Sequence, residues 1–201
     1  MNKIQAKYIT SYDQYIPAIF IDDQPLDQLI SIAAGDDFYR NLWCAWLSDE
    51  VQECKYIWTL LEEKREVNVP VLLCPDDMDF SCVIIVAQVC FAQDTVTWGK
   101  IGCVTGKFDV KKWRESGIQN IDSWSDDDWQ LYGGTLAWAD SDDEIWQRWW
   151  SEHWPDEEMR RIWNYYHPCF NDDRNIKWLD CGPFVFSISD YNACITVFKN
   201  Q

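Results

Sequence analysis

The sequence has few basic residues: 17 Lys and Arg face 34 Asp and Glu, and there are only two His. The formal net charge of −17 argues against direct binding to nucleic acid, because neutralising phosphates requires clustered Lys and Arg. The same charge favours a basic protein as partner. A simpler interpretation stays open, in which acidity only keeps a Trp-rich protein in solution.

Long apolar runs are also lacking. No run reaches the roughly 18 residues of a transmembrane helix, and the N-terminal residues lack the apolar core of a signal peptide. The nine cysteines form no Cys-x-x-Cys pair, and most lie within apolar runs, as is typical of reduced thiols packed as small hydrophobes. We therefore expect a cytoplasmic protein that does not bind membranes.

Motifs of catalysis are absent as well: the sequence has no Gly-x-Ser-x-Gly, no phosphate-binding Gly-rich loop and no His-Glu-x-x-His. The two histidines, His153 and His167, lie in an acidic stretch. A dyad of His167 and Cys169 is disfavoured, because residues two apart do not easily face each other and nearby acids oppose a thiolate. The sequence predicts a protein that is not an enzyme.

The order of apolar patterns predicts a single α+β domain with a mostly antiparallel central sheet and flanking helices. Strands are expected at residues 17–21, 69–74, 81–92, 95–105, 176–179 and 184–186, with a hairpin turn at Gln93-Asp94. Helices are expected from about 25 to Gly35, at 38–47 and 50–66, and at 190–199 after a Ser189 cap. The 50–66 helix is expected to bury Val51, Cys54, Ile57, Trp58 and Leu61.

An acidic, Trp-rich helical insertion is expected at about residues 107–174, with helices at about 141–153 and 155–167. Residues 122–158 hold twelve Asp or Glu and seven Trp, with Arg148 as the single Lys or Arg. A disordered acidic tail would be poor in aromatic residues, so we expect this segment to fold. Acids steer a basic partner and desolvated Trp residues anchor it, unless the Trp side chains form the insertion's own core. The predicted partner-binding residues are Asp126, Asp127, Asp128, Asp142, Asp143, Glu144, Trp146, Trp149 and Trp150.

Residues 74–82, CPDDMDFSC, place Asp76, Asp77 and Asp79 between two cysteines. Three carboxylates could hold Mg²⁺ or Ca²⁺, and two thiols could bind zinc, but further ligands at the usual spacing are missing. We favour a strand–turn–strand connection in which the Asp side chains accept backbone N–H groups. No cofactor and no bound metal are expected.

Several short motifs occur along the chain: Ile19-x-Ile21-Asp22 with Pro25-Leu26, residues 74–82 before an Ile/Val strand, Trp98-x-x-Ile101-Gly102, Lys177-Trp178 and Phe184-x-Phe186. In these motifs the chain resembles immunity proteins of bacterial polymorphic toxin and contact-dependent growth inhibition systems. The resemblance covers both ends and the central sheet but not the acidic insertion. It implies a cytoplasmic protein that binds one toxin domain, often a basic nuclease, and blocks it without catalysis.

The leading hypothesis is therefore a non-enzymatic immunity protein that binds and neutralises a cationic toxin domain. Two alternatives stay open: a metal-dependent hydrolase that uses Asp76, Asp77 and Asp79, and an adaptor protein without a toxin partner. Gene neighbourhood separates them, because an immunity gene is expected beside a toxin gene.

Overall fold

The computed structural model describes residues 1–64, 66–106 and 155–200, together with Asp109, Lys112, Ser116 and Glu152. Backbone contacts divide the chain into two compact units. The first unit comprises Met1–Gly106 and Cys169–Gln201, and the second comprises Lys107–Pro168. Helices and antiparallel strands together confirm the predicted α+β class, while the expected insertion boundaries, about 107–174, stay a prediction.

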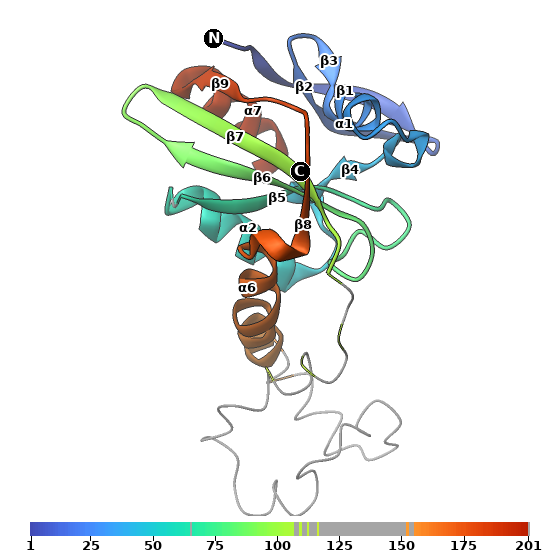
Figure 1. The fold of residues 1–201 in the computed structure, drawn as a ribbon, viewed down its shortest axis with the longest axis vertical. Coiled ribbons are helices and arrows are strands. Elements are labelled where there is room, and N and C mark those ends of the chain that lie inside the picture. Colours follow the sequence, from blue (N-terminus) through green and yellow to red (C-terminus); the bar gives the residue numbers. More distant parts are fainter. Residues whose placement is uncertain are drawn as a thin grey trace, which may run out of the picture. The chain divides into compact units, whose positions relative to one another are not determined.

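The larger sheet of the first unit has six strands in the order β4-β5-β6-β7-β8, with β9 also paired to β7 (Figure 1). Every pairing is antiparallel. The strands are β4 Trp43–Cys44, β5 Val67–Leu73, β6 Ile84–Phe91, β7 Thr95–Val104, β8 Ile176–Leu179 and β9 Phe184–Ser187. The central place expected for the 81–92 strand is confirmed, and so is the β6–β7 hairpin, closed by a bond from Ala92 N to Thr95 O at 2.8 Å.

The register between β7 and β8 depends on Gly102. A Cβ atom at this position would lie 2.6 Å from Cγ2 of Ile176 and 2.8 Å from the carbonyl oxygen of Lys177. Any larger residue would therefore push the two strands apart. On the same strand Val96, Trp98, Ile101 and Cys103 are buried, as the sequence predicts.

A smaller sheet at the N-terminus has the order β1-β2-β3, with β1 Ile4–Ser11, β2 Gln14–Ile21 and β3 Gln24–Pro25. Strand β1 was not expected from the sequence. Its hairpin with β2 turns at Tyr12 and Asp13, which both have positive φ, 48° and 62°. Two positive φ values are the mark of a type I′ turn, which usually contains Asn or Gly. A Tyr-Asp turn lacks that signal, so the strand before it was missed.

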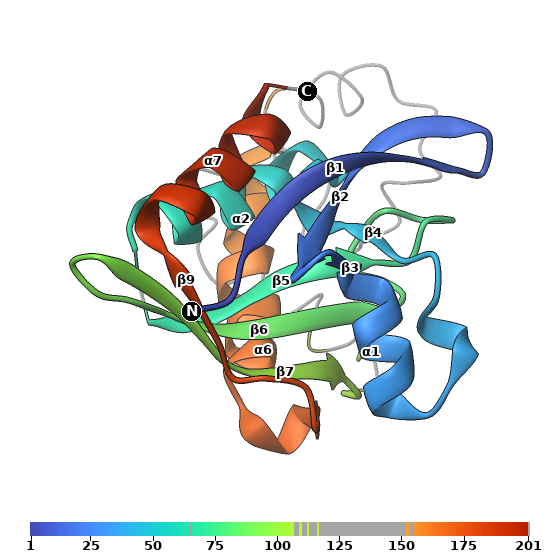
Figure 2. The ribbon, with the colours of Figure 1, turned by 90° about the horizontal axis from the view of Figure 1, so that it is seen from above.

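Helix α1, Leu26–Ala34, ends at Gly35 with φ 66° as predicted, and α2, Val51–Glu62, lies within the expected 50–66 helix. The terminal helix is α7, Ile188–Lys199. The predicted Ser189 cap is wrong: Ser187 Oγ accepts the Asp190 N–H at 3.0 Å, because the chain passes directly from β9 into the helix. Near the C-terminal ends of α2 and α7, both labelled in Figure 2, Lys199 pairs with Glu62 at 2.6 Å.

The predicted helix at 38–47 is wrong. The chain instead forms short 3-10 turns, η1 Asp37–Tyr39 and η2 Ala45–Leu47, on either side of β4. Asn41, with φ 66°, departs from helical geometry, and Trp43 and Cys44 pair with Leu73 and Leu72 of β5. Pairing with the central sheet therefore overrides the helical spacing of the apolar residues.

The buried face of α2 also differs from the prediction. Val51 is 62% exposed, and Cys54 and Trp58 are only partly buried, whereas Ile57 and Leu61 are buried as predicted. The helix instead turns Gln52, Glu53, Tyr56 and Leu60 inward. A buried polar side chain is tolerated at Glu53 because its carboxylate accepts the backbone N–H of Phe80 at 3.0 Å.

The core of the first unit gathers aromatic rings around Tyr191 of α7, which is fully buried. Its ring centroid lies between 5.9 and 6.4 Å from those of Phe91, Trp98, Phe186 and Trp46. These four residues belong to β6, β7, β9 and η2, so one side chain joins the sheet to the terminal helix. Most of the ring pairs meet edge to face, a preferred geometry for aromatic contacts.

In the second unit the described backbone at 155–161 is helical and passes into the π-helix η4, Ile162–Tyr166. Helix α6, His167–Phe170, follows and crosses the boundary between the units after Pro168. The predicted stop at His167-Pro168 is therefore wrong, because Pro168 lies in the first turn of α6, where a residue without an N–H to donate is tolerated. Tyr165 Oη accepts the Asp109 N–H at 2.7 Å, and Asn164 donates to the Ser116 carbonyl at 2.9 Å. Across both units, no helix among the described residues combines the length and apolarity needed to cross a bilayer.

Candidate functional site

The nine predicted partner-binding residues, Asp126 to Asp128, Asp142 to Glu144, Trp146, Trp149 and Trp150, lie outside the described residues. Their role therefore stays a prediction. The described part of the chain brings together two other arrangements in the first unit, a pocket beside the N-terminal hairpin and a cluster of metal-ligand side chains in the β5–β6 connection.

We call the first of these the hairpin pocket. Its volume is about 190 Å³, and Figure 2 shows the adjacent strands β2 and β4. The pocket is lined by Gln14, Tyr15, Ile16, Pro17, Trp43, Leu47, Asp49 and Met78. Two aromatic residues and one exposed acidic residue thus line a hollow whose surface is part polar and part apolar. It is smaller than the roughly 300–1,000 Å³ of typical small-molecule sites, and its size suits a single side chain of a partner protein.

Exposed tyrosines surround this pocket on the hairpin. Tyr15 is 73% exposed and stacks on Tyr8 with 5.0 Å between ring centroids. Tyr12, 62% exposed, lies 6.3 Å from the ring of Trp43. The Trp43 indole N–H donates to Ser11 Oγ at 3.0 Å, which fixes the ring against β1. A group of exposed aromatic side chains held by ring contacts and a side-chain hydrogen bond is typical of interface centres.

Two backbone hydrogen bonds fix Met78, another residue that lines the pocket. The Met78 N–H donates to the Cys74 carbonyl at 3.0 Å, and its own carbonyl accepts from Ser48 Oγ at 2.8 Å. Two residues further, the Phe80 N–H donates to the buried Glu53 carboxylate. Glu53 of α2 and Ser48, the residue that follows η2, therefore help to hold the β5–β6 connection in place.

The same connection contains the three aspartates singled out in the sequence. Asp79 accepts from the backbone N–H of Ser81 at 2.8 Å and from its hydroxyl at 2.6 Å, which confirms the predicted role in the turn for this residue. Asp77 instead groups with Cys74 and Cys82, and the ligand atoms of these three residues all lie within 4.8 Å of one another. Within the described residues, Asp76 and Asp79 do not belong to this group.

Several thiols in this unit, Cys82, Cys103 and Cys194 among them, are poor nucleophiles. Partial burial, together with the neighbouring Cys74 thiol and Asp77 carboxylate, raises the pKa of Cys82 to about 11. Burial likewise raises the pKa of Cys194 to about 12, and it also raises the pKa of Cys103. Since the thiolate is the reactive form, these residues are mostly unreactive thiols near neutral pH.

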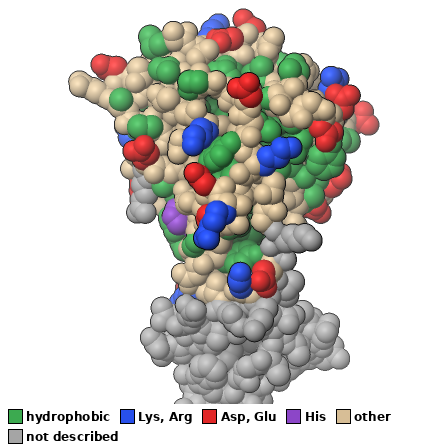
Figure 3. All heavy atoms as spheres, viewed as in Figure 1, with side chains coloured by type: hydrophobic (Ala, Val, Ile, Leu, Met, Phe, Trp, Pro, Cys, Tyr) green, Lys and Arg blue, Asp and Glu red, His purple; other side chains and the backbone are tan. Residues whose placement is uncertain are grey.

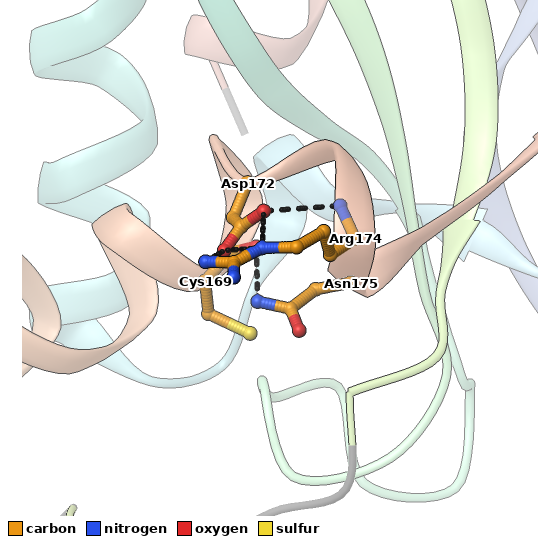
Figure 4. A network of polar contacts seen from close by, with 4 residues as sticks. All are labelled: Cys169, Asp172, Arg174 and Asn175. Carbon is orange, nitrogen blue, oxygen red and sulfur yellow. Dashed lines mark hydrogen bonds and ion pairs between the residues drawn. The ribbon is translucent and has the colours of Figure 1, made fainter.

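Cys169, considered above for a dyad with His167, takes part in a packed corner instead (Figure 4). Its carbonyl accepts from Asn175 Nδ2 at 3.4 Å, and a Cβ added to Gly106 would lie 3.3 Å from its sulfur. In the same corner Arg174 donates to both carboxylate oxygens of Asp172, and these bonds lower the pKa of Asp172 to about 2. The arrangement closes the turn before β8.

Charge in the first unit is strongly acidic. Residues 1–106 and 169–201 contain twenty Asp and Glu against ten Lys and Arg, and no Lys or Arg occurs from Glu66 to Gly99. The face shown in Figure 3 mixes Lys and Arg with Asp and Glu and does not present one sign of charge. Within the first unit, the β5–β6 connection, which contributes Met78 to the hairpin pocket, lies in this stretch without Lys or Arg.

Comparisons with protein-family models, with curated proteins and with solved structures give no match for this chain. The resemblance to immunity proteins therefore rests on the short motifs alone. The exposed tyrosines and Trp43 were missed by sequence reasoning, and the available signal was the recurrence of Tyr8, Tyr12 and Tyr15 around a turn. The spacing of these tyrosines indicates a surface group only once the hairpin turn at Tyr12-Asp13 is known.

Proposed function

We propose that the chain is a non-enzymatic cytoplasmic protein that binds a basic protein domain, and that it acts as the immunity partner of a cationic toxin, for instance a nuclease. The observation that carries the proposal is the hairpin pocket, where Tyr15, Trp43 and Asp49 lie around one hollow on an acidic unit. The motif resemblance supplies the biological setting.

The chemistry of the pocket suits a Lys or Arg side chain. An ammonium or guanidinium group is attracted to the faces of aromatic rings and gains further from a carboxylate within reach. The apolar walls, Pro17 and Leu47 among them, would cover the alkyl part of such a side chain. The surrounding acids would speed the encounter with a basic partner through long-range attraction.

The raised pKa values of Cys82 and Cys194 support a function in which these thiols are not catalytic nucleophiles. The alternative of a hydrolase built on Asp76, Asp77 and Asp79 has less support, because Asp79 is engaged by Ser81 and only Asp77 belongs to the ligand group. An adaptor protein without a toxin partner would use the same pocket, and gene neighbourhood distinguishes it.

The test uses the basic domain encoded beside the gene for this chain and measures its Kd for the full chain by calorimetry. The proposal predicts a one-to-one complex whose Kd rises at least about 30-fold, equivalent to about 2 kcal/mol, in Tyr15→Ala. Phe38→Ala is the matched control, because Phe38 is 64% exposed and does not line the pocket. Absence of binding by any neighbouring basic domain would contradict the proposal.

A further inference from the structure

The β5–β6 connection brings two thiols and one carboxylate to a single point. Cys74 directly follows β5, Cys82 lies two residues before β6, and Asp77 lies between them. Their ligand atoms, two sulfurs and one carboxylate oxygen, are mutually within 4.8 Å. Ligands bound to one tetrahedral zinc ion lie about 3.5–4 Å apart, given metal–sulfur and metal–oxygen distances of about 2.3 and 2.0 Å. Small side-chain rotations are therefore enough to close the set around an ion.

The backbone that carries these ligands is fixed without help from a metal. The Cys74 N–H donates to the Val83 carbonyl at 3.1 Å, which places the two ends of the connection next to each other. Between them, Met78 and Phe80 are buried and held by Ser48 and by Glu53. A ligand set whose backbone is already in place loses little entropy when an ion binds.

We propose that Cys74, Asp77 and Cys82 bind one thiophilic divalent cation of the zinc class, with water in the fourth position. Two sulfur ligands select zinc-class ions over Mg²⁺ and Ca²⁺, which prefer sets made of oxygen atoms alone. Asp76 and Asp79 add negative charge next to the ligands, and residues 66–99 contain no Lys or Arg to oppose the cation.

This proposal departs from the expectation drawn from the sequence, in which the turn carried no metal. The spacing of the cysteines does not match zinc motifs with four ligands in the sequence. In the fold, however, Asp77 of the turn lies with Cys74 and Cys82 as a third ligand. The ion would tie the two ends of the connection together and stiffen the wall that Met78 contributes to the hairpin pocket. The inference does not depend on the proposed function, because it concerns only the three ligands.

The test titrates Zn²⁺ into the reduced, chelator-treated full chain and follows Co²⁺ substitution by absorption. One equivalent of Zn²⁺ should bind, and Co²⁺ should give thiolate-to-metal charge-transfer bands. Cys74→Ser, Cys82→Ser and Asp77→Asn should each weaken zinc binding at least about 100-fold, since even residues that only support a ligand often contribute 10–100-fold. Asp76→Asn, an exposed acid of the same turn, is the control and should change the affinity less than about threefold.

Metal-free Asp77→Asn and Cys82→Ser should melt within about 2 °C of the parent chain, because both residues are exposed. A loss of zinc binding then reflects lost ligands rather than unfolding. The proposal is overturned if less than one equivalent binds, or if Cys82→Ser keeps the parent affinity. It is equally overturned if Cys74 and Cys82 form a disulfide in reducing buffer and the chain takes up no zinc.

Discussion

The buried carboxylate of Glu53 accepts the backbone N–H of Phe80 at 3.0 Å and so ties α2 to the β5–β6 connection. Glu53 is 6% exposed, and its second close neighbour is the hydroxyl of Ser48 at 3.4 Å. Through this bond a helix residue determines where the acidic turn and the Met78 wall of the hairpin pocket lie. This polar contact in the core therefore supports both candidate sites.

Removing that carboxylate should destabilise the protein. Glu53→Ala leaves the Phe80 N–H buried without an acceptor and opens a small cavity, so we expect the free energy of unfolding to fall by about 2–3 kcal/mol. Urea unfolding followed by Trp fluorescence measures it. Glu50→Ala is the control, since Glu50 is exposed and makes no side-chain cap bond, and should change stability by less than about 0.5 kcal/mol. Equal effects of the two substitutions would contradict the structural role of Glu53.

The start of α7 gives a second comparison. Ser187 Oγ accepts the Asp190 N–H, so Ser187→Ala should lower the free energy of unfolding by about 1 kcal/mol. Ser189→Ala, two residues further along the chain, should have a smaller effect because Ser189 is not the capping residue. Thermal or urea unfolding of the two variants decides between them, and a larger loss for Ser189→Ala would restore the cap expected from the sequence.

The corner in Figure 4 predicts a pH effect. Hydrogen bonds from Arg174 lower the pKa of Asp172 from the ordinary 3.8 to about 2. A depressed pKa in the folded state means that the pair stabilises the protein above the ordinary aspartate pKa and loses this contribution as the pH falls through about 2. NMR titration of the carboxyl carbon should show the low pKa, and Arg174→Gln should return it toward 3.8. An unchanged pKa in that variant would show that the arginine is not the cause.

The acidic segment outside the described residues yields a separate prediction. If Trp149 is an interface anchor, Trp149→Ala should cost at least about 2 kcal/mol of partner binding with an unchanged melting temperature. If it belongs to the insertion's own core, the melting temperature should fall instead. Reversing the charges of Asp126 to Asp128 and Asp142 to Glu144 tests whether these acids attract the partner. Unchanged affinity at low salt would exclude these acids and leave the hairpin pocket and the adjacent Asp76–Asp79 turn as the interface.

Sequence patterns located most of the sheet, because long apolar strands such as β6 and the alternating β7 carry strong signals. They failed where tertiary contacts override local preference. Residues 38–47 have helical spacing but pair with β5, and β1 precedes a Tyr-Asp turn that lacks the usual Gly or Asn. The buried face of α2 was misassigned because a satisfied acid, Glu53, replaces an apolar residue.

The candidate sites were less predictable than the fold. The aspartates of residues 76–79 attracted attention as a group, but only the fold shows that Asp77 lies with the cysteines and Asp79 with Ser81. The hairpin pocket joins residues from three places along the chain, near Tyr15, Trp43 and Met78. No local sequence pattern predicts that these residues lie together, because their proximity depends on the packing of β2 beside β4.

The central claim, that acids on this protein draw in a basic partner, is tested most directly by the association rate constant as a function of salt. Stopped-flow mixing with the basic domain encoded beside the gene gives this rate. Exposed charges are screened beyond about 8 Å at physiological ionic strength, so steering predicts a steep fall in the association rate as salt rises and a much weaker change in dissociation. An association rate that does not change with salt would contradict the account.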